Sequence, residues 1–237
     1  MTPRQARGPG EGRGPGEGRG PGEGRGPGEG RGPGEGRGPG EGRGAKVVLA
    51  THNPHKVEEF AAIVAATRPD LELVGYDGPE PVEDGVTFAE NALIKARAAA
   101  RHTGAPAFAD DSGVSVAVLG GSPGIFSAYW AGHAKDPVAN RRLLLDQISD
   151  IADPHRTARF VSVIALVTPD GQERVVEGVW PGRIATEERG DGGFGYDPVF
   201  IPDGQDRTVG EWTDAEKAAQ SHRARAFAAL APLLAQL

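Results

Sequence analysis

Two adjacent carboxylates stand between apolar residues in the stretch FADDSGVSV, residues 108–116. A strand arriving through residues 107–109 would deliver Asp110 and Asp111 to its end, where successive side chains point to opposite faces. We expect one carboxylate to face the scaffold and the other to face a cleft. Neighbouring negative charges repel unless a cation, a backbone donor or protonation relieves them. The pair therefore predicts a metal site or an acid–base site.

A second group of polar residues follows the apolar run at residues 46–50, which reads as a buried strand. Asn53 is a good N-cap and Pro54 a good first helical residue, so a helix should begin here. A strand, a short loop and a helix N-terminus together offer the backbone N–H groups and the dipole that hold a phosphate. Lys56 lies in the first turn, where it could share a bound anion. The alternative is an ordinary capped helix with a solvated lysine.

A third group lies in the last part of the chain. Residues 192–198, GGFGYDP, place aromatic side chains beside glycines, and the capping box TDAE at residues 213–216 starts a helix. The early turns of that helix carry Lys217, His222 and Arg223, which is unusually basic for a packed terminal helix in an acidic protein. We interpret these residues as a cationic wall opposite the carboxylates. A solvated helix face is the alternative.

The three groups complement one another as parts of a nucleotide site. The first loop and its lysine suit phosphates, the acidic residues suit Mg²⁺, the aromatic residues suit a planar base, and a His-Arg pair suits a base edge. An acidic protein that binds an anionic nucleotide needs a metal to bridge like charges, and hard oxygen ligands favour Mg²⁺. The sequence therefore predicts a nucleotide as the ligand.

Two other motif matches predict different chemistry. Residues 190–195, GDGGFG, satisfy the dinucleotide pattern GxGxxG, but they lead into Tyr-Asp-Pro and not into a helix. Residues 120–124, GGSPG, satisfy the nucleophile-elbow pattern of esterases, with Asp197 and His222 following in hydrolase order. The residue after that serine is Pro123, which has no N–H for an oxyanion hole. The esterase interpretation is therefore a minor alternative.

Composition restricts the partners. The 237 residues carry a net charge of −7, which argues against nucleic acid or an anionic membrane as a partner. The chain has no cysteine, so disulfides, thiol catalysis and Cys-ligated zinc are excluded. It also has no run of about 18 apolar residues and no apolar signal-peptide core, so we expect a soluble, cytoplasmic protein.

The N-terminal segment differs from the rest of the chain. The unit Gly-Pro-Gly-Glu-Gly-Arg repeats six times between Gly8 and Arg43. Such a segment has no apolar surface to offset its ordering entropy, so residues 1–44 are predicted to be a disordered tail before a domain at residues 45–237. An RNA-associated role is the alternative for this Arg-Gly tail, although each repeat Arg is matched by a Glu.

The domain itself predicts an α/β fold. Strands are expected at residues 46–50, 71–75, 114–119 and 156–167, and a hairpin turn at residues 168–171 leads into a partner strand through residue 184. Helices are expected from residues 54, 87, 137 and 213. This mixture with at least one hairpin predicts a mixed central β-sheet flanked by helices.

Five stretches in order resemble the inosine triphosphate pyrophosphatase family over essentially the whole domain. They are THNPHK at 51–56, TFAENA at 87–92, ADDSG at 109–113, GFGYDP at 193–198 and SHR at 221–223. The resemblance implies an elongated, two-lobed single domain with a central cleft, usually a homodimer. It implies Mg²⁺-dependent hydrolysis of ITP, dITP and XTP to the nucleoside monophosphate and pyrophosphate.

The resemblance also implies a role for each matching residue. Asp111 would be the general base, and Glu83 and Asp111 would hold Mg²⁺. This leaves Asp110 as the inward-facing carboxylate, a candidate to orient a water molecule. Lys95 is a further candidate phosphate contact. Phe194 to Asp197 would bind the base and sugar, and His222 and Arg223 would recognise the 6-oxo group. The full set of implied substrate-binding residues is Thr51, His52, Asn53, His55, Lys56, Ser112, Phe194, Gly195, Tyr196, Asp197, Lys217, His222 and Arg223.

This chain departs from the family pattern at two positions. Tyr129 stands where the family usually has Arg, and Trp212 stands where a smaller apolar residue is common. A cation lost at residue 129 could weaken phosphate binding, which leaves a catalytically weak nucleotide-binding protein as a further alternative. Neither change removes a predicted catalytic residue.

Overall fold

The computed structural model describes residues 46–237. The predicted tail at residues 1–44 and its boundary with the domain therefore lie outside the described residues. Within residues 46–237, no helix is both long enough and apolar enough to cross a membrane.

Six strands form one mixed sheet in the order β2-β1-β3-β4-β5-β6. β1 pairs in parallel with both β2 and β3, whereas the pairs β3–β4, β4–β5 and β5–β6 are antiparallel. The predicted mixed sheet and the predicted hairpin between β4 and β5 are thus confirmed. The strands are β1 (Lys46–Leu49), β2 (Glu72–Gly75), β3 (Ala107–Val116), β4 (Thr157–Val167), β5 (Glu173–Ile184) and β6 (Phe200–Pro202).

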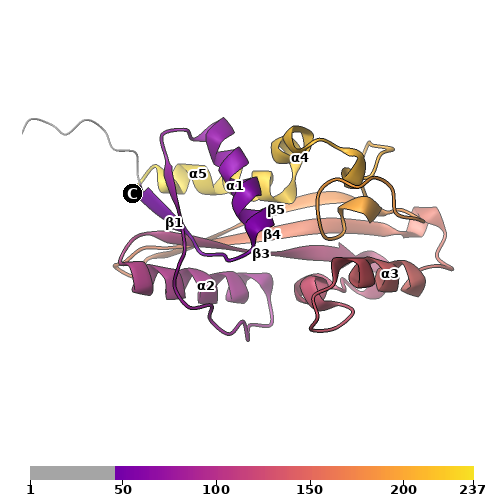
Figure 1. The fold of residues 1–237 in the computed structure, drawn as a ribbon, viewed down its shortest axis with the longest axis horizontal. Helices are drawn as coiled ribbons and strands as arrows, with labels where there is room; N and C mark the ends of the chain where they lie inside the picture. Colours follow the sequence, from indigo (N-terminus) through magenta and orange to yellow (C-terminus); the bar gives the residue numbers. More distant parts are fainter. Residues whose placement is uncertain (1–45) are drawn as a thin grey trace, which may run out of the picture. The chain divides into compact units, whose positions relative to one another are not determined.

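Helices cover both faces of this sheet. Figure 1 shows α1, α4 and α5 on one side of the long strands and α2 and α3 on the other. The helices are α1 (Pro54–Thr67), α2 (Phe88–Thr103), α3 (Pro137–Gln147), α4 (Asp214–Gln220) and α5 (His222–Leu234).

The predicted helix starts are confirmed by their caps. Asn53 accepts hydrogen bonds from the first turn of α1, and Asp136 does the same for α3. Thr87 and Glu90 form the predicted capping box of α2. Gly104 ends α2 at φ +65°, a left-handed conformation that glycine adopts without a steric penalty. Local sequence chemistry therefore fixes where these helices begin and end.

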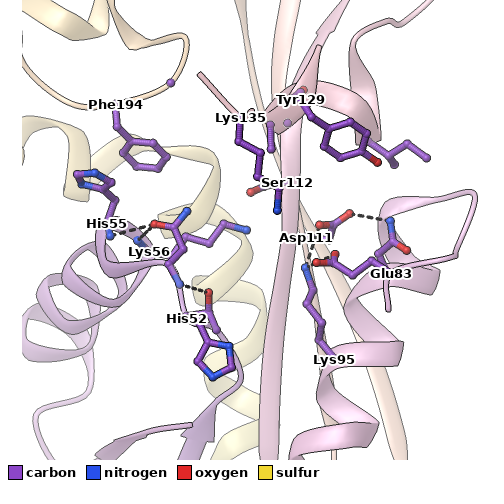
Figure 2. A pocket seen from close by; sticks show the side chains of 18 of the residues that line it. His52, His55, Lys56, Glu83, Lys95, Asp111, Ser112, Tyr129, Lys135 and Phe194 are labelled. Atoms are coloured by element: carbon purple, nitrogen blue, oxygen red, sulfur yellow. Dashed lines mark hydrogen bonds and ion pairs between the residues drawn. The ribbon is translucent and has the colours of Figure 1, made fainter. Parts of the chain in front are cut away.

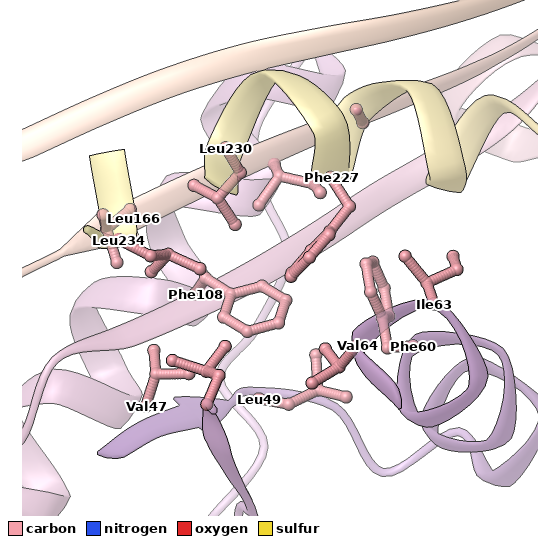
Figure 3. Close-up of a cluster of buried hydrophobic side chains, with 13 residues drawn as sticks. Val47, Leu49, Phe60, Ile63, Val64, Phe108, Leu166, Phe227, Leu230 and Leu234 are labelled. Carbon is pink, nitrogen blue, oxygen red and sulfur yellow. The ribbon is translucent and has the colours of Figure 1, made fainter. Parts of the chain in front are cut away.

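Aromatic side chains fill the core between the sheet and helices α1 and α5. Phe60, Phe108 and Phe227 contact one another edge-on or tilted, with ring centroids 5.4–6.4 Å apart (Figure 3). On the opposite face of the sheet, α2 contributes mostly alanines, including Ala92 and Ala96. Small side chains let α2 lie close to the strands, so the helix that carries Lys95 is held firmly against the sheet.

The prediction for the carboxylate stretch was wrong in one respect. β3 does not end at Asp110 and Asp111 but continues to Val116, and residues 117–119 form a 3₁₀ turn, not more strand. Every β3 residue pairs with a residue of β4, so the antiparallel ladder carries the strand through its polar centre. Cations on the neighbouring helices compensate the charge, as described below.

The terminal helix also differs from the prediction. It consists of two helices, α4 and α5, that are separated at Ser221. Ser221 has ψ 163°, and its side chain accepts a hydrogen bond from the backbone N–H of Ala224, so it caps α5. The break turns His222 and Arg223 inward, because they begin a new helix whose first turn faces the sheet. Both residues are buried.

Candidate active site

A cavity opens where β1 ends beside the longer strand β3. β1 reaches only as far as Leu49, which pairs with Phe108, so the next residues of β3 lack a strand partner on that side. A cavity of about 790 Å³ lies at this open edge, large enough for a nucleotide. The site therefore depends on the difference in length between two neighbouring strands.

Asp110 lies beneath this cavity in a network of cations. The Lys56 ammonium lies 2.9 Å from its Oδ2 atom, and the Arg223 guanidinium lies 3.3 Å from the same atom. The hydroxyls of Ser112 and Ser162 also donate to this carboxylate. Burial alone would raise the pKa of Asp110, but Lys56, Arg223 and Ser162 together hold that pKa far below its ordinary value. These contacts favour the charged form of Asp110, which fits the scaffold-facing member of the pair.

Asp111 points to the other face of β3 and has a different environment. Its Oδ1 atom accepts a hydrogen bond from Lys95 Nζ at 3.0 Å, and the same ammonium lies 2.8 Å from Glu83 Oε2. The amide of Asn91 donates to Asp111 Oδ2 at 3.4 Å. Burial raises the pKa of Asp111 above its ordinary value, and Lys95 only partly opposes this. A carboxylate with a raised pKa in a cavity is a candidate proton acceptor.

Lys56 is positioned by the helix start that the sequence predicted. The side chain of Asn53 accepts from the backbone N–H groups of His55 and Lys56, which fixes the first turn. Lys56 Nζ crosses to β3, where it also donates to the carbonyl oxygen of Asp110 at 3.2 Å. Burial lowers the pKa of Lys56, and Asp110 opposes that effect. The alternative of a solvated lysine is therefore wrong for this side chain.

The loop before β6 brings an aromatic ring to the cavity. Phe194 stacks on His55 with ring centroids 5.0 Å apart, and Lys217 Nζ lies 4.5 Å from the centre of its ring. Asp197 accepts from the backbone N–H of Phe194 at 2.8 Å and from Lys217 at 2.6 Å. Gly193 is required here, because a Cβ would lie only 2.1 Å from the Asp197 carboxylate. The loop therefore presents Phe194 in a fixed position.

His222 lies at the inner wall of the cavity. Its ring stacks on Phe160 with centroids 4.8 Å apart, and it is 3% exposed. Burial, with a further contribution from Arg223, lowers the pKa of His222 well below its ordinary value, so the ring is neutral at neutral pH. Its Nδ1 atom has no hydrogen-bond partner among residues 46–237. A neutral imidazole with a spare nitrogen can donate to or accept from a ligand.

Arg223 contacts three side chains of the fold, which the sequence did not indicate. Its guanidinium donates to Ser112 Oγ at 2.8 Å and to Glu59 at 2.6 Å, in addition to its contact with Asp110. Glu59 was missed in the sequence, although it also pairs with Lys217. The available signal was its position in α1, three residues after Lys56, which places both side chains on neighbouring positions of one helix face. Through Glu59, α1 links the two cations of α4 and α5.

The cavity brings together the predicted substrate, metal and general-base residues, whereas Asp110 is buried behind its wall. Figure 2 shows His52, His55, Lys56 and Phe194 on one side of β3, and Glu83, Lys95 and Tyr129 on the other. The sequence-predicted residues that line the cavity are Thr51, His52, Asn53, His55, Lys56, Glu83, Lys95, Asp111, Ser112, Phe194, Gly195, Tyr196, Asp197, Lys217, His222 and Arg223. Lining residues that the sequence did not suggest include Tyr76, Asn91, His133, Lys135, Asn140 and Phe160.

Comparison with known proteins identifies the family. The model of the Ham1 family matches residues 47–233. The chain belongs to the Ham1 family. It is 61% identical to the dITP/XTP pyrophosphatase of Leifsonia xyli subsp. xyli over 192 residues, which covers 81% of this chain and 96% of the relative. It is 53% identical to the dITP/XTP pyrophosphatase of Streptomyces coelicolor, covering 81% of this chain and 98% of the relative.

Solved Ham1 structures share the fold. The Ham1 protein of Staphylococcus aureus matches with a TM-score of 0.72 and 36% identity, covering 81% of this chain and 98% of that one. The dITP/XTP pyrophosphatase of Mycobacterium abscessus matches with a TM-score of 0.64 and 49% identity, covering 79% and 99%. The predicted family resemblance and the predicted α/β fold with a mixed sheet are both confirmed.

The esterase and dinucleotide alternatives find no support in this Ham1 chain. Ser122 does not line the cavity that contains Asp197 and His222, so the three residues do not form a catalytic triad. Asp197 is occupied by Lys217 and the backbone N–H of Phe194. The glycine-rich stretch at residues 190–195 leads into a 3₁₀ turn, Asp197–Val199, and not into an α-helix.

The donor set of the Ham1 cavity fits a hard cation that is held mainly by its substrate. Glu83 and Asp111 are joined through Lys95, and residues 46–237 contain no cluster of three or more His, Asp or Glu side chains suited to a metal. Mg²⁺ usually takes one or two protein carboxylates and completes its shell with water and substrate phosphates. Two carboxylates at the edge of a nucleotide-sized cavity match that pattern.

Proposed function

We propose that this chain hydrolyses non-standard purine nucleoside triphosphates, namely ITP, dITP and XTP, to the nucleoside monophosphate and pyrophosphate. The observation that carries the proposal is one cavity that contains a carboxylate of raised pKa at one end and an aromatic loop with a neutral histidine at the other. The names of the Ham1 relatives from Leifsonia xyli subsp. xyli and Streptomyces coelicolor support the same reaction.

Asp111 is the general base of this reaction. Its carboxylate accepts a proton from a water molecule, whose oxygen bonds to the α-phosphorus while the bond from that phosphorus to the α–β bridging oxygen breaks. The bridging oxygen leaves with pyrophosphate. A raised pKa makes the carboxylate a stronger proton acceptor than an ordinary aspartate. Lys95 orients this carboxylate through its 3.0 Å hydrogen bond.

Glu83 and Asp111 would hold Mg²⁺, with Asn91 positioning Asp111 by its amide. A bound Mg²⁺ neutralises charge that develops on the phosphate oxygens during transfer. Because Lys95 lies between the two carboxylates in this structure, its ammonium keeps them together before the substrate and the ion arrive. This assignment predicts that chelation abolishes turnover.

The phosphate chain binds between the first loop and β3. Thr51, Asn53 and Lys56 contribute from the start of α1, and Ser112 contributes from β3. Arg223 already donates to Ser112, so it fixes the direction of that hydroxyl. Buried cations with fixed partners lose little entropy on binding, so they stabilise transition-state charge without reorganising.

The base binds at Phe194 and is read by His222. Phe194 offers a ring face, and Lys217 and Arg223 lie 4.5 Å and 5.3 Å from its centre. The neutral imidazole of His222 donates to the 6-oxo oxygen of hypoxanthine or xanthine. The 6-amino group of adenine would meet this donor with another donor and leave both unpaired, a mismatch that strongly disfavours binding.

Three wider properties are part of the same proposal. The catalytic domain is residues 45–237, the protein acts in the cytoplasm on the free nucleotide pool, and it works as a homodimer without nucleic acid or membrane as a partner. The acidic net charge of −7 supports the absence of a polyanionic partner. Light scattering at micromolar concentration tests the dimer, and a monomer mass would contradict it.

The test of the reaction is a Mg²⁺-dependent assay of ITP, dITP and XTP against ATP and GTP, in which pyrophosphate and phosphate are measured separately. We expect pyrophosphate as the first product and a preference for ITP, dITP and XTP. The Asp111→Asn variant is the matched control, because it keeps the size of the side chain but removes the base. Free phosphate as first product, or equal rates with ATP, would contradict the proposal.

A further inference from the structure

The cations that line the cavity are unequally engaged. Four of the five Lys and Arg side chains in its wall form ion pairs: Lys56 with Asp110, Lys95 with Asp111 and Glu83, Lys217 with Asp197 and Glu59, and Arg223 with Glu59 and Asp110. Lys135 is the fifth, and its side chain makes no ion pair or hydrogen bond within residues 46–237. Its charge is the one in the wall that no carboxylate compensates.

The nearest acidic residue in the chain is already occupied. Asp136 follows Lys135 directly, but its carboxylate accepts the backbone N–H groups of Val138 and Ala139 and so caps α3. Lys135 is exposed, and Figure 2 shows its side chain between Phe194 and Tyr129, directed toward Ser112 on β3. The Lys135 side chain therefore enters the cavity beside Ser112, and no carboxylate within residues 46–237 pairs with it.

The backbone of Lys135 is strained. It has φ +54°, and it is the one residue other than glycine with a positive φ between residues 46 and 237. A side chain in the left-handed region is disfavoured, and glycine would adopt the same conformation without penalty. Residues held in such conformations concentrate at functional sites, where the surrounding structure enforces the strain. Lysine at this position therefore makes the fold less stable than glycine would. In return, it places a positive charge in the cavity.

We propose that Lys135 is a substrate-binding residue that contacts the phosphate chain beside Ser112. This inference rests on the proposed function for the identity of the substrate. Tyr129 and His133 line the same wall and stack on each other with ring centroids 5.3 Å apart. Lys135 adds a positive charge to this aromatic part of the wall.

The phosphate chain is the better partner for Lys135 than the base. A nucleoside triphosphate carries several negative charges, and the other four cations are already paired with protein carboxylates. The base end of the cavity is formed by Phe194 and His222, whereas Lys135 points toward Ser112. Lysine acts as a point charge for phosphate and offers no planar recognition of a base edge.

Binding of inorganic tripolyphosphate by calorimetry tests this directly, because the probe has no base. We expect Lys135→Ala and Lys135→Gly to weaken its binding roughly 10-fold, as for a hydrogen bond to a charged group, and Lys135→Arg to keep most of the affinity. Inosine binding should be unchanged in all three. The matched control is Lys46→Ala, which removes an exposed lysine of β1 outside the cavity and should leave tripolyphosphate binding unchanged.

The KM for ITP and the melting temperature distinguish a binding role of Lys135 from a purely structural one. With ITP, Lys135→Ala should raise KM roughly 10-fold with little change in kcat, as for loss of uniform binding. Lys135→Gly should melt about 2–4 °C higher than the wild type, because glycine relieves the strained φ. A lower melting temperature for Lys135→Gly would contradict the claim that the lysine is kept at the expense of stability.

The outcomes separate this inference from the proposed function. Wild-type affinity for tripolyphosphate in both Lys135→Ala and Lys135→Gly would overturn the role of Lys135, even if ITP is hydrolysed as expected. If the wild type binds tripolyphosphate through Lys135 but does not release pyrophosphate from ITP, the proposed reaction fails while the anion site remains.

Discussion

Asp110 and Asp111 are neighbours in the sequence, but β3 turns their side chains into two different environments. Asp110 is 1% exposed, and Lys56 and Arg223 hold its pKa far below its ordinary value. The Asp111 side chain is 14% exposed, and burial without full compensation raises its pKa. The difference comes from the helices, because α1 and α5 bring two cations to one face and α2 brings one shared lysine to the other.

Asp110 is suited to stabilising the fold, whereas Asp111 is suited to accepting a proton. An anion with two buried cations is stabilised in its charged form and has little tendency to accept a proton. A carboxylate that shares one lysine with Glu83 remains basic and accessible from the cavity. The same residue type at consecutive positions can therefore serve the fold at one position and the reaction at the next.

The largest effect is expected from Asp111→Asn. Removal of the general base should lower kcat for ITP by at least ~100-fold, within the range for such groups. The free energy of unfolding should not fall, because a raised folded-state pKa means that the ionised carboxylate of Asp111 opposes folding at neutral pH. Steady-state kinetics and urea unfolding of the same preparation measure both quantities. Near-wild-type turnover would move the base elsewhere.

Asp110→Asn, the matched substitution one residue earlier, should mainly lower the stability of the fold. Asp110→Asn leaves Lys56 and Arg223 without their buried anion, and breaking a buried ion pair typically costs about 3–5 kcal/mol. Urea unfolding should therefore show a much lower midpoint. The folded pKa of Asp110 is depressed, so its contribution is present above the unfolded pKa of about 4 and is lost as the pH falls further. A variant as stable as the wild type at pH 7 would contradict this role.

A smaller effect is expected from Lys95→Gln. The ammonium of Lys95 lowers the pKa of Asp111, so its removal should raise that pKa further. Because the base must be ionised, the acid limb of the kcat profile should move to higher pH, while the Lys46→Ala control should leave the limb in place. A limb that does not move, or that moves to lower pH, would indicate that another group controls the profile.

Much of the fold could be predicted because it depends on local chemistry. Asn53, the Thr87 capping box and Gly104 mark helix ends through hydrogen bonds within a few residues of each position. The candidate site residues could be predicted because most of them lie in short motifs that follow one another in order along the chain. Their gathering in one cavity follows once the strands are paired, because α1, β3 and α5 all meet at the open edge.

The remaining features depend on partners that are distant in the sequence. β3 continues through Asp110 because β4 pairs with it, and its charge is tolerated because Arg223, more than a hundred residues later, lies beside it. Glu59 gains its role only when Lys217 and Arg223 reach it across the fold. Lys135 belongs to none of the sequence motifs, and its φ of +54° and its lack of an ion pair within residues 46–237 are properties of the folded chain alone.

The most direct test of the division between the two carboxylates is a ¹³C NMR titration of the aspartate side chains in metal-free protein, with Asp111→Asn used to assign the Asp111 signal. We expect Asp111 to titrate above the ordinary aspartate pKa of about 3.9, and Asp110 to show no titration before the protein unfolds in acid. Titration of Asp110 at or above the midpoint of Asp111 would contradict the account.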